Sequence, residues 1–208
     1  MKVKICGMRD PQNIREVALL KPDFMGFIFY PASPRYLASA EAFPFDALKV
    51  TITTGVFVNA TDSDIVNAIR SYKLKAVQLH GNENQEFCKS IRQLGVKVLK
   101  AVSVADESDL TNLQRYEGTV DYLVLDTKTK QYGGSGSQFN WDLLNAYTAD
   151  IPFLLSGGID EQDSKRIAQL HHPMLAGVDL NSRFELEPGL KNVEKVNRFL
   201  DRMRSKNI

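Results

Sequence analysis

Residues 121–141 read DYLVLDTKTKQYGGSGSQFNW and combine an apolar strand, an acid and a glycine-rich loop. The run at 122–125 contains aromatic and β-branched side chains and predicts a buried strand, which ends on Asp126. Gly133-Gly134-Ser135-Gly136 forms a loop with almost no side chains, and Phe139-Asn140-Trp141 begins the next helix. An acid at the C-terminal end of such a strand is typical of an α/β active site, although Asp126 could instead only cap the following turn.

Seven other short apolar segments are similar to the one at 122–125. The predicted strands cover residues 3–6, 24–29, 53–58, 76–79, 96–102, 122–125, 153–155 and 177–180. Helices are predicted from Asp10-Pro11, from Thr61 or Asp62, and over 84–94, 109–116, 141–147, 163–170 and 193–203. This alternation predicts an α/β protein in which residues 1–208 form a single (β/α)8 TIM barrel with parallel strands, one catalytic domain.

The main alternative is a doubly wound open sheet. Such a sheet normally has fewer strands, and its nucleotide-binding forms need a glycine fingerprint directly after the first strand. Cys6-Gly7-Met8 follows the first predicted strand and lacks that spacing. The closed barrel is therefore the preferred fold.

The composition argues against several classes of partner. The 208 residues carry a net charge of +1, with basic residues scattered among acids, so neither nucleic acid nor an anionic membrane is implied. No apolar run is long enough to span a bilayer, and the first residues have no apolar signal core. Two cysteines, Cys6 and Cys88, make no disulfide framework, so a reducing cytoplasm is expected. The sequence does not decide between a monomer and a homodimer.

In a (β/α)8 barrel the C-terminal ends of the strands share one face, and function lies there. The predicted strand ends present a thiol, a guanidinium, an imidazole, carboxylates and two loops of the kind that bind phosphate. The candidate site residues are Cys6, Arg35, His80, Asp126, Gly157, Gly158, Asp179 and Ser182. The glycine pair follows the seventh strand, where barrels commonly bind phosphate on backbone amides, so a phosphate site is favoured over an ordinary tight turn.

Simpler explanations exist for several side chains. His80 could bind a metal, but the other two histidines are adjacent in a distant loop and no three-ligand set is visible, so no metal is expected. A satisfied or substrate-facing histidine is preferred. Arg35 could be a solvated loop charge. A buried cysteine usually only packs, as expected for Cys88, and Trp141 is also expected to pack, whereas Cys6 ends a strand at the predicted mouth.

A series of short motifs, in order along nearly the whole chain, is similar to that of one enzyme family. The motifs are KICG at 4–7, GFIFY at 26–30, SPRY at 33–36, GVFVN at 55–59, VQLHG at 77–81, LD at 125–126, GGSG at 133–136, FNW at 139–141, SGG at 156–158, GVD at 177–179 and PGLK at 188–191. The chain resembles the phosphoribosylanthranilate isomerase family of tryptophan biosynthesis. One motif would be a weak signal, but the ordered set is a specific one.

The resemblance implies an Amadori rearrangement that needs no cofactor. The substrate would be the small phosphorylated aminoaldose N-(5′-phosphoribosyl)anthranilate, and the product 1-(2-carboxyphenylamino)-1-deoxyribulose 5-phosphate. In the family the cysteine of KICG is the general base and the aspartate that ends the sixth strand is the general acid, which correspond to Cys6 and Asp126. Arg35 resembles the arginine that binds the anthranilate carboxylate.

The chemistry of the reaction, considered apart from the resemblance, also requires one acid and one base. Opening the furanose ring leaves electrons on its oxygen, which an acid must protonate, and the resulting iminium acidifies the C2′ hydrogen for a modest base. Because the iminium is itself the electron sink, neither metal nor organic cofactor is needed. A protonated aspartate and a cysteine thiolate both require shifted pKa values, which the sequence does not show.

The chain departs from the family pattern after the eighth predicted strand. Asn181-Ser182-Arg183 replaces a small glycine-containing segment, and this change could close off a left-handed backbone position. Arg183 could add a positive charge near the phosphate or point outward to Glu185 or Glu187. These differences concern the phosphate contacts rather than the reaction.

Two other functions stay open on the sequence. A metal-dependent epimerase of a pentose 5-phosphate would share the barrel and the phosphate site, but it needs a carboxylate and histidine ligand cluster. A non-catalytic phosphate-binding or scaffold protein would not require Cys6 and Asp126 together at the mouth. Metal analysis and a turnover assay would separate these functions from the isomerase.

Overall fold

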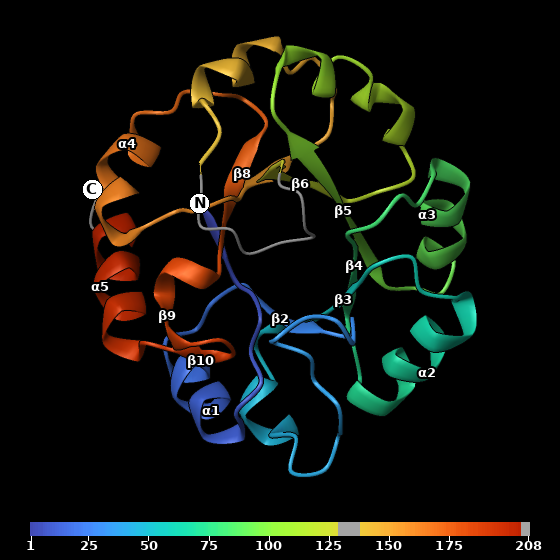
Figure 1. Cartoon of the computed structure of the whole chain (residues 1–208), viewed down its shortest axis with the longest axis vertical. Coiled ribbons are helices and arrows are strands. Elements are labelled where there is room, and N and C mark those ends of the chain that lie inside the picture. The colour runs from blue at the N-terminus through green and yellow to red at the C-terminus, as the bar shows by residue number, and fades with distance from the viewer. Residues whose placement is uncertain (129–137, 205–208) are drawn as a thin grey trace.

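The computed structural model describes residues 1–128 and 138–204, and at its centre is a closed barrel of eight parallel strands (Figure 1). Each strand pairs with the next one along the chain, and β1 closes the barrel against β8. The strands are β1 (Lys2–Ile5), β2 (Phe24–Ile28), β3 (Ile52–Phe57), β4 (Ala76–Leu79), β5 (Lys97–Val104), β6 (Tyr122–Thr127), β7 (Phe153–Leu155) and β8 (Leu175–Leu180). The predicted barrel is confirmed, and the open sheet is wrong.

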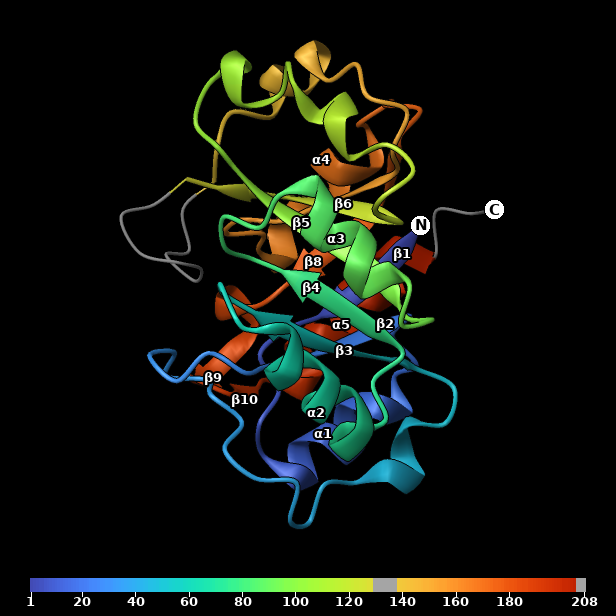
Figure 2. The same ribbon diagram turned by 90° about the vertical axis from the view of Figure 1, so that its right-hand side faces the viewer.

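Helices and short 3₁₀ turns surround the barrel (Figures 1 and 2). The α-helices are α1 (Pro11–Leu19), α2 (Asp62–Tyr72), α3 (Gln85–Arg92), α4 (Ser164–Ala168) and α5 (Val193–Arg204), and the 3₁₀ turns include η1 (Phe45–Leu48), η5 (Glu161–Asp163) and η6 (Ser182–Phe184). Sequence signals explain where the helices begin. The side chain of Asp10 accepts a hydrogen bond from Asn13 N–H at 2.7 Å, and that of Thr61 accepts one from Asp64 N–H at 3.2 Å.

Two predicted α-helices are 3₁₀ segments instead. In place of the helix predicted at 109–116 stand η2 (Glu107–Asp109) and η3 (Leu113–Tyr116), and the Asp109 carboxylate accepts a hydrogen bond from Ala105 N–H at 2.8 Å at the start of η2. After β6, η4 (Trp141–Ala146) stands where an α-helix was expected. The antiparallel pair β9 (Glu185–Glu187) and β10 (Leu190–Lys191) has no counterpart among the predicted strands, since segments this short show no periodicity.

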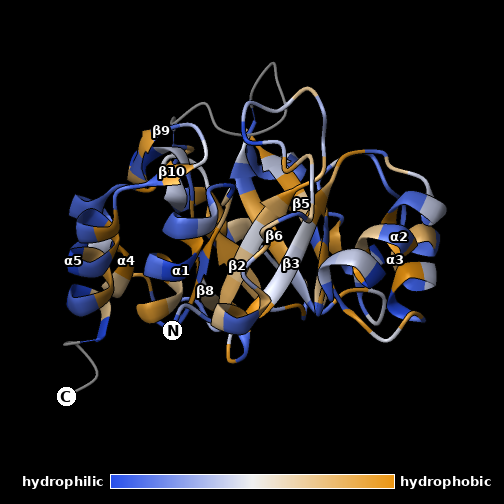
Figure 3. Ribbon diagram, turned by 90° about the horizontal axis from the view of Figure 1, so that it is seen from below, coloured by the Kyte–Doolittle hydropathy of each residue, from blue (hydrophilic) through white to orange (hydrophobic). Residues whose placement is uncertain are grey.

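Apolar side chains fill the inside of the barrel and the space between the barrel and its helices. The inner cluster consists of Ala76, Leu99, Ala101, Val124 and Leu154. Figure 3 shows apolar strands at the centre and hydrophilic outer faces on the helices. The predicted packing roles are confirmed, since Trp141 is 2% exposed and Cys88 is fully buried. Burial raises the pKa of the Cys88 thiol to about 11, which keeps it protonated.

The direction of the strands decides where a site can form. Because all eight strands are parallel, their C-terminal ends lie on one face, on the side of β9 and β10 and opposite the N-terminus (Figure 3). None of the helices in the described ranges has both the length and the apolar character needed to cross a bilayer.

Candidate active site

A cavity opens on the face where the strands end. Its walls come from all but one of the strand ends and from the loops that follow them. All the predicted site residues line it: Cys6, Arg35, His80, Asp126, Gly157, Gly158, Asp179 and Ser182. The glycine-rich loop predicted at 133–136 lies outside the described residues.

A fully buried lysine accompanies the candidate base. Side chains alternate along a strand, so Lys4 and Cys6 share the inner face of the barrel. Lys4 pairs in register with Asp179 of β8, and its Nζ lies 2.9 and 3.1 Å from the two carboxylate oxygens. Gly26 on β2 makes room for this arrangement, because a Cβ there would lie 2.9 Å from Cys6 Sγ and 3.2 Å from Lys4 Nζ. The thiol and the ammonium are therefore close neighbours.

Burial and the neighbouring charge of Lys4 act in opposite directions on the ionisation of Cys6. Burial raises the pKa of the Cys6 thiol above its ordinary value, and the positive charge of Lys4 acts against that increase. Burial also tends to lower the pKa of Lys4, but the charges of Asp179 and Cys6 outweigh it, and the pKa of Lys4 is raised. Lys4 therefore stays protonated and favours a thiolate beside it. Asp179, predicted to contact substrate, commits both its oxygens to this ion pair.

The candidate acid lies beside an imidazole. Asp126 is the next-to-last residue of β6, and its Oδ1 accepts a hydrogen bond from Thr127 N–H at 2.9 Å. Its Oδ2 lies 3.5 Å from Nε2 of His80, which follows β4. The loop after β7 closes on the same carboxylate at Gly157, where φ is +85° and a Cβ would lie 2.8 Å from Thr127 N. Asp126 thus faces the cavity between a backbone amide and an imidazole.

Gln78 orients His80 and is a site residue that sequence reasoning missed. Both side chains point into the barrel, two positions apart, and Gln78 Nε2 lies 3.2 Å from His80 Nδ1. When the amide donates to Nδ1, the neutral imidazole carries its proton on Nε2, which faces Asp126. The two-residue spacing within VQLHG was the available signal. Across the described ranges, no three His, Cys, Asp or Glu side chains are grouped so as to hold a metal ion.

Arg35 is buried at the cavity wall, so the alternative of a solvated loop charge is wrong. It is 8% exposed, and its Nε and Nη2 donate to the two Glu185 oxygens at 2.6–3.0 Å. Lys191 donates to the same carboxylate at 2.6 Å and to Asn181 Oδ1 at 2.9 Å. Burial alone would raise the pKa of Glu185, but the two cations hold it below its ordinary value. Arg35 therefore reaches the cavity as part of a buried ion-pair cluster that the sequence did not predict.

The loops after β7 and β8 meet at the same wall. Gly157 and Gly158 have φ of +85° and +61°, a region of backbone conformation that favours glycine. Ser182 begins η6, and none of Asn181, Ser182 and Arg183 has a positive φ, so the missing family glycine does not leave a strained left-handed residue there. Arg183 lines the cavity, and its charge therefore lies near these loops.

Comparisons with known proteins point to one family. A family model described as N-(5'phosphoribosyl)anthranilate (PRA) isomerase matches residues 3–202. The N-(5'-phosphoribosyl)anthranilate isomerase of Parabacteroides distasonis is 44% identical over 206 residues, which cover 98% of this chain and 93% of the relative. The resemblance seen in the motifs is therefore confirmed over nearly the full length.

Solved structures agree with the sequence comparison. The phosphoribosyl anthranilate isomerase of Thermotoga maritima has a TM-score of 0.85 and 32% identity, with 99% of each chain covered. A phosphoribosyl anthranilate isomerase in complex with reduced 1-(o-carboxyphenylamino)-1-deoxyribulose 5-phosphate has a TM-score of 0.80 and 28% identity, again with 99% of each chain covered. On this evidence the chain belongs to the N-(5'-phosphoribosyl)anthranilate isomerase family.

Proposed function

We propose that Cys6 and Asp126 act as general base and general acid in the Amadori rearrangement of N-(5′-phosphoribosyl)anthranilate. As a member of its family, the chain is an isomerase of tryptophan biosynthesis. The assignment of roles rests on one observation: Cys6 and Asp126 come from β1 and β6, which are not neighbours, yet both line one cavity. The loops proposed to bind phosphate follow β7 and β8, between those two strands. A phosphate anchored there would hold the sugar between the acid and the base.

The reaction requires two proton transfers. Protonated Asp126 gives its proton to the furanose oxygen while the C1′–O bond breaks, and the anilino nitrogen lone pair forms the iminium. The Cys6 thiolate then removes the C2′ proton, and the electrons of that C–H bond neutralise the iminium to give an enolamine. Moving the enol proton to C1′ yields the ketone, and proton exchange with water restores the thiolate and the acid. Substrate and product are isomers, so no oxidant or reductant is consumed.

The charged side chains around Cys6, the proposed general base, favour its thiolate form. In the described part of the chain, three buried cations and two buried carboxylates surround this wall, namely Lys4, Arg35 and Lys191 with Asp179 and Glu185. One positive charge is in excess, and ionised Cys6 would balance it. Removing a proton from carbon therefore needs no additional counter-ion at this wall.

We expect Arg35 to bind the carboxylate of the anthranilate ring. Glu185 occupies the Nε–Nη2 edge of Arg35, so the Nη1–Nη2 edge would hold the substrate carboxylate with two parallel hydrogen bonds, in the ground state and in the transition state alike. Arg35→Ala should therefore raise KM more than it lowers kcat. A desolvated charged hydrogen bond contributes about 1.5–3 kcal/mol, which corresponds to roughly 10- to 150-fold in KM. Steady-state kinetics with the native substrate would measure the change.

A matched control and an analogue make this test specific. Arg9 donates to Pro34 O in the same loop at 2.9 Å but does not line the cavity, so Arg9→Ala should leave KM unchanged. Wild type should strongly prefer the substrate over an analogue that carries aniline in place of anthranilate, and Arg35→Ala should lose most of this preference. If Arg35→Ala keeps the full preference for the carboxylate-bearing substrate, another group binds the carboxylate.

The second prediction tests the proposed function directly. Purified protein should convert freshly made N-(5′-phosphoribosyl)anthranilate to the aminoketose in the presence of excess chelator, because the iminium supplies the electron sink. Activity that disappears on chelation and returns with zinc or iron would instead support the metal-dependent epimerase. Binding of the substrate without turnover would support a phosphate-binding scaffold.

Residues 1–208 are proposed to form one catalytic domain that acts in the cytoplasm as a monomer or a homodimer, with neither nucleic acid nor membrane as a partner. Both cysteines are free thiols, which is consistent with a reducing compartment. Size-exclusion chromatography with light scattering would decide the oligomeric state.

A further inference from the structure

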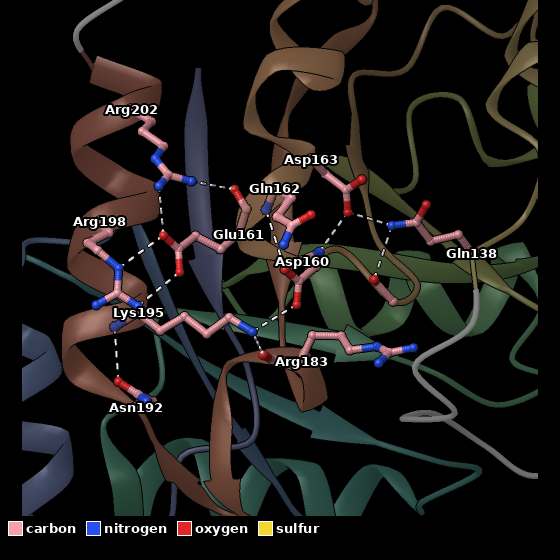
Figure 4. Close-up of polar contacts among 11 residues, drawn as sticks. Gln138, Asp160, Glu161, Gln162, Asp163, Arg183, Asn192, Lys195, Arg198 and Arg202 are labelled. Carbon is pink, nitrogen blue, oxygen red and sulfur yellow. Dashed lines mark hydrogen bonds and ion pairs between the residues drawn. The ribbon is translucent and has the colours of Figure 1, made fainter.

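A lysine on the last helix contacts both loops that form the proposed phosphate subsite (Figure 4). Lys195 Nζ lies 2.8 Å from Asp160 Oδ2, in the segment that follows β7, and 2.7 Å from the carbonyl oxygen of Arg183, in the segment that follows β8. We propose that Lys195 is a positioning residue, which fixes the separation of the two loops so that their backbone amides can bind one phosphate. This inference rests on the proposed function, whose substrate carries that phosphate.

Hydrogen bonds hold the first turn of α5, which carries Lys195, in place. Lys195 lies in the first turn of the helix, and its backbone N–H donates to Asn192 Oδ1 at 3.0 Å. Asn192 N–H in turn donates to Phe184 O, in η6, at 2.8 Å. The Nζ atom also lies 5.4 Å from the centre of the fully buried Phe184 ring. The lysine is therefore anchored to the loop after β8 by its own helix cap and by its side chain.

The loop after β7 is held from its other side by a second set of contacts. Gln138 Nε2 donates to Gly158 O at 3.1 Å and also to Asp163 Oδ2 (Figure 4). Asp160 N–H donates to the same Asp163 oxygen at 2.7 Å. Residues 158–160 are thus held by Gln138 of the connection between β6 and β7 and by Asp163 of their own segment, and the link to Lys195 places that segment against the one after β8.

Lys195 also neutralises a carboxylate near the proposed anion site. Asp160 is two residues from Gly158, and its side chain is 33% exposed. Burial tends to raise the pKa of Asp160, but the hydrogen bond from Lys195 and nearby backbone amides hold it below its ordinary value. Without Lys195 this carboxylate would repel a phosphate dianion. Both effects of Lys195, the spacing and the neutralisation, act on binding of the phosphate rather than on the protons at C1′ and C2′.

The test compares Lys195→Met, Lys195→Gln and Lys195→Arg with Arg198→Met. Arg198 lies one turn further along α5 and pairs with Glu161 at 3.0 Å, so its loss removes an α5 ion pair without touching Asp160 or the Arg183 carbonyl. The measurements are KM, kcat and the inhibition constant of inorganic phosphate. We expect Lys195→Met to raise KM and the phosphate inhibition constant about tenfold and to change kcat less than about twofold. Lys195→Arg should remain close to wild type, and Lys195→Gln should lie between the two.

The possible outcomes distinguish this inference from the proposed function. Turnover by wild type together with an unchanged phosphate inhibition constant in Lys195→Met would overturn the role of Lys195 and leave the proposed function standing. If Arg198→Met raised KM and the phosphate inhibition constant as much as Lys195→Met does, the effect would come from the packing of α5 in general. That result would also overturn the role of Lys195. A wild type that does not turn over the substrate would reject both. Methionine keeps the aliphatic stem of Lys195, whose side chain is one-quarter exposed, so the variant should fold.

Discussion

Asp126→Asn is expected to lower kcat by at least about 10²-fold while the protein stays folded, as the loss of a general acid typically does. Asparagine is nearly isosteric with aspartate, and its carboxamide oxygen can still accept the 2.9 Å hydrogen bond from Thr127 N–H. It cannot give an acidic proton to the furanose oxygen when the ring opens. Cys6→Ala should show a loss of similar size, because alanine cannot take the C2′ proton.

Matched variants separate catalysis from folding. Asp142 is an exposed acid on η4, and Cys88 is a buried thiol that does not line the cavity, so Asp142→Asn and Cys88→Ala should keep near-normal kcat. Steady-state turnover and circular dichroism of all four variants would test this. Near-normal turnover by Asp126→Asn or Cys6→Ala would remove that residue from the mechanism.

The barrel could be predicted because each strand carries its own signal. Short apolar runs that end in polar or glycine residues were sufficient to find all eight strands, and parallel order followed from the helical segments between them. The connections at 107–116 and 141–146 were harder, because their apolar spacing is compatible with either an α-helix or short 3₁₀ turns.

The members of the site were predictable, but their contacts were not. Strand ends can be counted along the sequence, so Cys6, His80 and Asp126 were expected on one face. Arg35 and Glu185 are 150 residues apart, and nothing local in either segment indicates that they form a buried pair. Lys4 was missed for a different reason, since a charged residue in a strand is usually assigned to the solvent side. Its position two residues before Cys6 was the available signal, because alternate residues share a face.

The largest expected loss of stability comes from Lys4→Met. Methionine has a similar length, but it leaves the Asp179 carboxylate, which is 6% exposed, without its cation. Removing one partner of a buried ion pair costs about 3–5 kcal/mol, because the remaining charge is uncompensated. For a chain of this size such a loss corresponds to a fall in Tm of roughly 6–20 °C, which calorimetry would measure.

The same substitution should also change the pH dependence of Cys6. Burial already raises the pKa of the thiol, and Lys4 opposes that increase, so removing Lys4 should move the pKa further upward. The thiolate is the form present above the pKa, and the rise of kcat/KM with pH should therefore shift to higher pH in Lys4→Met. Alkylation of Cys6 by iodoacetamide, measured in a Cys88→Ala background, should shift in the same direction without depending on turnover.

A double variant distinguishes the structural role of Lys4 from its effect on the base. Lys4→Met combined with Asp179→Asn leaves no uncompensated carboxylate, so much of the lost Tm should return. The positive charge beside Cys6 is still missing, and the alkylation profile should remain shifted toward high pH relative to wild type, because Lys4 influences the thiol more strongly than Asp179 does. Recovery of stability together with a wild-type alkylation profile would show that Lys4 only neutralises Asp179 and that another group stabilises the thiolate.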